Sequence, residues 1–241
     1  MRRKIILILY VAVFFLIGGC APKEYRVNPE FTSLSKEIRN PILPHPKIEV
    51  YELTAGGVRE LKQEWCDIGL ENVATAVLQN LQSIKCKIME KNLSPAMEEK
   101  IEDLRALYTA VSYSIQMHAM NPQSPMAFPA KMANFDYSIG PIDDLLKELG
   151  ADGIILIYGS DEISTGGRQG LIAAGLIVGL ATGVYAGPRV GITSINASII
   201  NPDGKIIWYS SKASGGHDLR DKESVDKIIQ QLFADFPKLG T

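Results

Sequence analysis

The stretch LGADGIILIY, residues 149–158, carries the strongest structural signal in this chain. Gly150 follows an amphipathic segment, Ile142–Leu149, and ends a predicted helix. Ile154–Tyr158 is then apolar without interruption, which is typical of a strand that is buried on both faces. Asp152 lies between the helix and the strand, where we expect it to organise the turn. The stretch therefore predicts a central strand within a sheet that is covered by helices.

A hairpin and a closing helix are predicted on the carboxyl side of this strand. Val190–Ile200 has an alternating pattern, and Lys205–Ser211 is the returning strand. Between them, Asn201–Gly204 has the composition of a tight turn, with a glycine where a positive φ is needed. Asp221–Phe236 places its apolar residues on one helical face.

Two more strands and two more helices are predicted on the amino side. The strands are Lys47–Leu53 and the short Cys86–Met89, and the helices are Asp67–Ser83 and Ser94–Met120. Asn121–Asn134, with three prolines, is predicted to be a loop. The order strand–helix–strand–helix–helix–strand–insert–strand–strand–helix predicts an α/β fold, with α+β as the alternative, on a mixed sheet of about five strands with flanking helices.

Two motifs on these elements resemble a known group. GADGIIL at residues 150–156 and DGKIIW at residues 203–208 resemble periplasmic lipoprotein domains shaped like the amino-terminal domain of TolB, the group of CsgG and LpoB. The resemblance covers Lys47–Phe236 and implies a TolB-like domain at residues 47–241. It also implies non-enzymatic work in envelope assembly or secretion. It supplies no catalytic residues, and the long helix and the insert depart from the smallest members, so it names no specific partner.

Residues 1–19 have the composition of a cleaved lipoprotein signal peptide. A cationic start at residues 2–4 precedes the uncharged run Ile5–Leu16, which is shorter than the ~20 apolar residues of a membrane-spanning helix. Leu16-Ile17-Gly18-Gly19-Cys20 then resembles the lipobox of bacterial lipoproteins. We therefore predict that Cys20 becomes the acylated first residue of the mature chain. The alternative is an uncleaved membrane anchor in which this cysteine is incidental.

Residues 20–46 are predicted to be an acylated tether, because they hold five prolines and little periodicity. Lipoproteins of this type carry two or three acyl chains, palmitate among them, and more than one chain is needed for stable anchoring. Ala21 is not the aspartate that marks inner-membrane retention in enterobacteria. The resemblance thus implies the periplasmic face of the outer membrane, while inner-membrane anchoring and surface exposure stay open.

The mature chain is mildly acidic. Loss of three basic leader residues changes the formal net charge from −2 to −5, and without a basic cluster the chain is unsuited to nucleic acid. Cys66 and Cys86 fall at opposite ends of one predicted helix, about 25 Å apart. They are therefore predicted to be free thiols.

The insert at residues 166–188 contains the most unusual segment. Residues 171–187 carry no charge, and Gly175, Gly179, Gly183 and Gly187 recur every four residues. On a helix this glycine zipper predicts a groove that another backbone approaches closely. Each glycine in a water-facing helix lowers the stability of the helix by about 1 kcal/mol relative to alanine. We therefore expect a contact of this segment that compensates for the loss. Three interpretations stay open: packing on the same domain, self-association into a homo-oligomer, and re-entrant or shallow membrane contact.

No catalytic, cofactor-binding or metal-binding motif is evident. His45, His118 and His217 lack metal-ligand spacing, and the glycines at residues 166–170 lack the Lys-Ser/Thr of a phosphate loop. We therefore predict a non-enzymatic outer-membrane lipoprotein, without cofactors, that binds other envelope proteins in assembly or secretion. The alternative is a lipid-anchored periplasmic enzyme acting on cell wall or small molecules. A pocket with convergent ionisable groups would favour that alternative.

Overall fold

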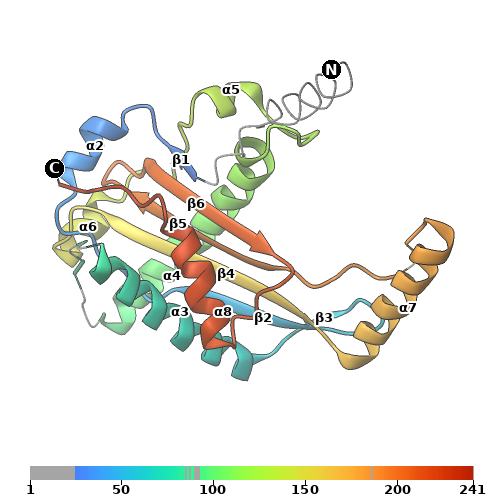
Figure 1. The fold of residues 1–241 in the computed structure, drawn as a ribbon. Helices are drawn as coiled ribbons and strands as arrows, with labels where there is room; N and C mark the ends of the chain where they lie inside the picture. The colour runs from blue at the N-terminus through green and yellow to red at the C-terminus, as the bar shows by residue number, and fades with distance from the viewer. Residues whose placement is uncertain (1–24, 85, 87, 90–92, 186, 241) are drawn as a thin grey trace, which may run out of the picture.

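The computed structural model describes residues 25–84, 86, 88, 89, 93–185 and 187–240. They form a six-stranded sheet in the order β1-β6-β5-β4-β2-β3. Strands β2 and β4 are parallel, and the other neighbouring strands are antiparallel. Figure 1 shows α3 and α8 over one face of the sheet and α4 behind it. The predicted mixed α/β fold with flanking helices is confirmed.

The predicted order is wrong at its second strand, since no described residue of Cys86–Met89 belongs to a strand, and it lacks the short elements β1, α2, β3 and α5. The strands are β1 Tyr25–Val27, β2 Lys47–Leu53, β3 Arg59–Leu61, β4 Ile154–Ser164, β5 Thr193–Ile200 and β6 Ile206–Ser214. The helices are α2 Phe31–Glu37, α3 Gln63–Ser83, α4 Pro95–Ile115 with its π-helical extension η1 Gln116–Met120, α5 Pro129–Ala133, α6 Asp143–Leu149, α7 Gly166–Thr182 and α8 Lys222–Leu232. The described part of the strand predicted at Cys86–Met89 contributes an isolated bridge between Met89 and Ile42.

Strand β4 is buried on both faces, as its apolar run predicts. Ile155 and Ile157 belong to a core shared with α3 and α8. Ile154 and Leu156 belong to a second core shared with α4 and α6. Its edges pair with β5 over Ile154–Asp161 and with β2 over Tyr158–Ser164, so β4 is a central strand of the sheet.

Buried hydroxyl groups join α4 to the sheet. Tyr108 donates a hydrogen bond to Asn196 Oδ1 (2.6 Å), and its hydroxyl lies 2.8 Å from that of Ser198. Ser112 and Tyr209 form a second hydroxyl pair at 2.8 Å. Burial raises the pKa of Tyr209 to about 12 and that of Tyr108 well above its ordinary value. Both phenols are therefore protonated at neutral pH and available as donors.

The tether predicted at residues 20–46 is wrong from Tyr25 onward, because these residues are part of the folded domain. Strand β1 pairs with β6, with Tyr25 opposite Ser210, and α2 follows it. Ile38 and Ile42 are then buried in the two cores. Pro29 lies in the turn between β1 and α2, and Pro41, Pro44 and Pro46 lie in the irregular segment between α2 and β2. Cys20 lies outside the described residues.

Asp152 has a wider role than the predicted one of organising its own turn. Its carboxylate accepts hydrogen bonds from the backbone N–H groups of Arg39 (2.8 Å) and Asn40 (2.9 Å). It therefore fastens the amino-terminal segment to the start of β4.

The turn between β5 and β6 has the positive φ that its sequence predicts. Gly204 has φ +74°, and a Cβ placed there would lie 1.6 Å from the carbonyl oxygen of Gly140. A glycine is therefore required both by the backbone conformation and by the close approach of a second segment.

We expect Gly204→Ala to lower the free energy of unfolding by at least about 2 kcal/mol, because the left-handed conformation and the clash add together. Gly170→Ala is the matched control, since nothing lies within 4 Å of a Cβ at that helical position and alanine favours a helix by about 1 kcal/mol over glycine. Denaturant unfolding followed by circular dichroism measures both. Equal midpoints for the two variants would contradict this account of the turn.

Candidate functional site

Helix α7 and the segment that returns from it form an arm at one end of the sheet. We define the arm as residues 166–192, which are described apart from Ala186. It connects the end of β4 to the start of β5, and Figure 1 shows α7 projecting beyond the strands. The predicted insert is therefore a helix followed by an irregular return.

The base of the arm is fixed by arginine side chains. Arg168, only 4% exposed, donates to the carbonyl oxygens of Thr54 (3.1 Å) and Arg189 (2.9 Å). The Arg189 guanidinium makes two hydrogen bonds with the Glu162 carboxylate, at 2.6 and 3.0 Å. Arg59 pairs with the same carboxylate at 3.0 Å. We call Arg59, Glu162, Arg168 and Arg189 the base cluster.

Beyond the base cluster, the surface of α7 is apolar and exposed. Arg168 and Gly175 are its buried residues. The exposed aliphatic side chains are Leu171, Leu176, Ile177, Val178 and Leu180, with Ile177 at 68% and Leu180 at 82%. At 3.6 residues per turn they occupy more than half of the circumference. A helix that is apolar nearly all round is normally buried, and this one is not covered by its own domain.

The four predicted groove glycines do not share one helix face, so the predicted continuous glycine groove is wrong. Gly175 and Gly179 lie in α7, whereas Gly183 ends it with φ +75° and Gly187 lies in the return. A Cβ on Gly179 would lie 3.4 Å from the Cα of Tyr185. The backbone of Tyr185, in the segment that returns from α7, thus packs against Gly179.

Polar groups at the tip of the arm are satisfied by side chains of the arm itself. The hydroxyl of Thr182 donates to the carbonyl oxygen of Val178 (2.8 Å) and accepts from the N–H of Val184 (3.3 Å). Tyr185 donates to the carbonyl oxygen of Pro188 at 2.7 Å. The tip therefore presents less unpaired backbone than an irregular loop of this length usually does.

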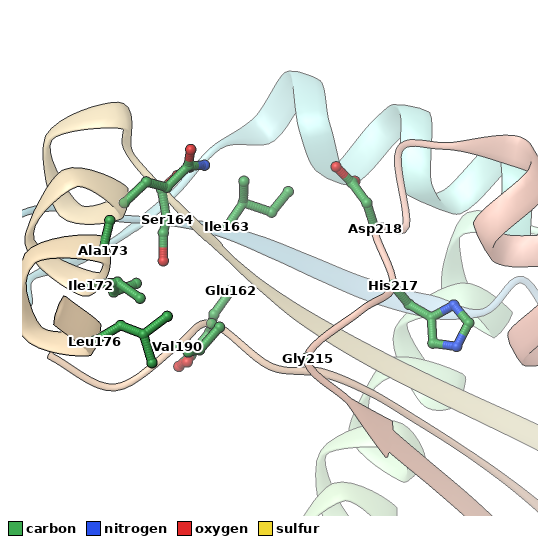
Figure 2. A pocket seen from close by; sticks show the side chains of 12 residues that line it. Glu162, Ile163, Ser164, Ile172, Ala173, Leu176, Val190, Gly215, His217 and Asp218 are labelled. Atoms are coloured by element: carbon green, nitrogen blue, oxygen red, sulfur yellow. The ribbon is translucent and has the colours of Figure 1, made fainter. Parts of the chain in front are cut away.

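A cleft of about 440 Å³ lies between α7, the end of β4 and the loop after β6 (Figure 2). Its ionisable side chains are held by other residues. Glu162 belongs to the base cluster, Asp218 pairs with Arg220 at 2.8 Å, and His217 Nδ1 lies 3.1 Å from the hydroxyl of Ser224. Figure 2 shows the His217 ring directed away from Glu162. The groups do not converge on a common point.

Asp161, 1% exposed, connects β4 to the loop beside this cleft. It accepts a hydrogen bond from the N–H of Leu219 (2.8 Å), and its other oxygen lies 2.8 Å from the hydroxyl of Thr193. That hydroxyl also lies 2.6 Å from the carbonyl oxygen of His217. Since a threonine has one hydroxyl proton, both contacts are hydrogen bonds when Asp161 is protonated. Burial raises the pKa of Asp161, in agreement with this arrangement.

The structure places the remaining sequence candidates away from any shared site. Cys66 and Cys86 are thiols that form no disulfide bond with each other, as predicted, and burial raises the pKa of Cys86 to about 11. His118 lies in η1, where its Nδ1 is 2.7 Å from the carbonyl oxygen of Met126. Asp161 was missed because the apolar run that identifies β4 ends before it. Its charge within a strand was the available signal.

No protein-family model matches the chain, and no curated protein matches it significantly. Within the described residues, no group of three or more His, Cys, Asp and Glu side chains is placed to hold a metal ion. None of the helices in that part of the chain is long and apolar enough to cross a membrane.

We expect Asp161→Asn to preserve the fold at pH 7, because its amide donates to Thr193 while its oxygen accepts from Leu219. Because the pKa of Asp161 is raised in the folded protein, its protonated form adds to the free energy of unfolding. This contribution is complete below the unfolded pKa of about 3.9 and is lost as the pH rises through the folded pKa. The stability of the asparagine variant relative to wild type should therefore increase from pH 4 to pH 7.

Asp161→Ala is the control for this prediction. It leaves the buried Leu219 N–H without an acceptor and should lower the free energy of unfolding by about 1–3 kcal/mol. Urea unfolding at both pH values measures the three proteins. The predicted hydrogen-bond arrangement is wrong if the asparagine variant loses as much stability as the alanine variant.

Proposed function

We propose that this protein is a lipid-anchored, non-enzymatic binding module of the bacterial cell envelope and that the arm is its contact element. The observation that carries the proposal is the exposed surface of α7, where five large aliphatic side chains lie together without a charge. Contiguous exposed apolar surface of this kind marks interaction sites with proteins or membranes. The hydrogen bonds of Arg168 fix the base of the arm, so the arm presents this surface in a defined position.

The sequence of the leader supports the anchoring part of the proposal. The cationic start, the short apolar run and the lipobox-like Leu16–Cys20 all favour acylation of Cys20. With Ala21 next to it, the proposed location is the periplasmic face of the outer membrane. The TolB-like resemblance favours a role in envelope assembly or secretion.

The cleft supports binding over catalysis. A catalytic acid, base or nucleophile needs to reach a common reacting atom. Glu162, His217 and Asp218 are each engaged with a different partner, and the ring of His217 points away from the arm. The exposed aliphatic side chains of α7 lie next to this cleft and offer apolar contact surface.

The anchor is tested with Cys20→Ser. We expect the wild-type chain, labelled in growing cells with an alkyne fatty acid, to incorporate the label and to sediment with membranes. The variant should lose the label, because no other thiol lies at the lipobox. Cys86→Ser is the matched control and should be labelled like wild type. Label that persists in Cys20→Ser would refute acylation at this residue.

The arm is tested by placing a photo-crosslinking amino acid at Ile177 in cells. We expect adducts with an envelope component after illumination, because this side chain is exposed at the centre of the apolar surface. Leu107, which is exposed on α4, is the matched control position. Adduct yields at position 177 no higher than those at position 107 would show that the arm is not the contact element.

A further inference from the structure

We propose that the arm inserts shallowly into the lipid bilayer to which acylated Cys20 is attached and thus gives the protein a second membrane contact. This inference rests on the proposed anchor, and it commits the arm to one partner, the acyl-chain region of a phospholipid bilayer. It is argued from chain length, charge distribution and hydrogen bonding.

The first described residue, Tyr25, points the chain toward the end of the sheet from which the arm departs. Strand β1 runs antiparallel to β6, so that its first residue, Tyr25, faces the end at which β6 finishes and α7 begins. Tyr25 lies opposite Ser210, four residues before Ser214 and hence about 14 Å from that end. The five steps from Cys20 to Tyr25 reach at most about 17 Å. Five residue steps are therefore long enough to reach the end of the sheet from which the arm departs.

The charges of the arm are confined to its base. No charged residue lies between Arg168 and Arg189, and the guanidinium group of Arg189 is paired with Glu162. A helix that lies flat on a membrane needs a charged face toward water, which α7 lacks. An arm that enters tip first keeps the base cluster at headgroup level and places Leu176 and Leu180 among acyl chains.

Hydrogen bonding at the tip fits an apolar surrounding. Unpaired backbone groups cost several kcal/mol each in hydrocarbon. At the tip this number is reduced because the hydroxyl of Thr182 accepts from the N–H of Val184 and donates to the carbonyl oxygen of Val178. In water these carbonyl and N–H groups would need no such partners.

The geometry makes the insertion re-entrant. α7 has 17 residues, or about 25 Å, which is less than the ~30 Å hydrocarbon thickness. The return leads back to β5, which pairs with β4 directly beside the departure point. All strands therefore stay on one side of the membrane.

A second copy of the chain is the less favoured occupant. Close packing of apolar helices uses small residues that let two backbones approach. Here the surface of Gly179 faces Tyr185 of the same arm, and the exposed residues are large aliphatic ones. Lipid chains accommodate such a surface without requiring a complementary shape.

Depth-dependent fluorescence quenching of the full chain tests the inference. Leu180→Trp and Leu107→Trp chains are purified in detergent and reconstituted into vesicles of phosphatidylethanolamine and phosphatidylglycerol, some carrying a nitroxide on the acyl chain. Both positions are exposed, so neither change should disturb the fold. The emission of the native Trp65 and Trp208, measured on the wild-type chain in the same vesicles, is subtracted. We expect the remaining emission of the tryptophan at position 180 to be quenched and to shift to shorter wavelength, and that of the tryptophan at position 107 to behave as in water.

Equal quenching at the two positions overturns the inference. If the position 180 tryptophan is unquenched and Ile177→Cys chains form disulfide-linked dimers, the arm binds a second copy instead. The intact mass of the same samples reports acylation of Cys20 separately. A chain that lacks the acyl mass yet shows quenching at position 180 refutes the proposed anchor but keeps the membrane contact of the arm.

Discussion

Burial of β4 on both faces is the constraint on which the rest of the structure depends. Its side chains alternate between two cores, and its edges pair with β2 and β5. The direction of the strand is therefore fixed, and so is the position of its last residues, of which Ile163 still packs against the first core. Asp161 there holds the loop at Leu219, and Glu162 holds Arg59 and Arg189. The arm thus starts from a rigid platform.

Elements governed by local chemistry could be predicted from the sequence. The hydroxyl of Ser94 caps α4 by accepting from the N–H of Met97, and Gly150 ends α6 with φ +73°. The bounds of β2 agree residue for residue with the alternating stretch Lys47–Leu53. Such signals depend on neighbours in the chain, so one sequence contains them completely.

Contacts between distant segments could not be predicted in the same way. Strand β1 exists because Tyr25 pairs with Ser210, and its three residues show no periodicity of their own. Asp161 shows its role only once the loop at Leu219 is placed against it. The four-residue glycine spacing is equally compatible with one helix and with a helix followed by a turn. Only the conformation of Gly183 distinguishes the two.

The short link between Cys20 and Tyr25 changes what the proposed anchor implies. A long tether would let the domain rotate freely, whereas five steps hold one end of the sheet close to the bilayer. If both proposed attachments form, so short a link raises the effective concentration of the arm at the membrane. In the proposed orientation α6 and the turn at Gly204 lie at the opposite end of the sheet. That end then faces away from the membrane, toward other components of the envelope.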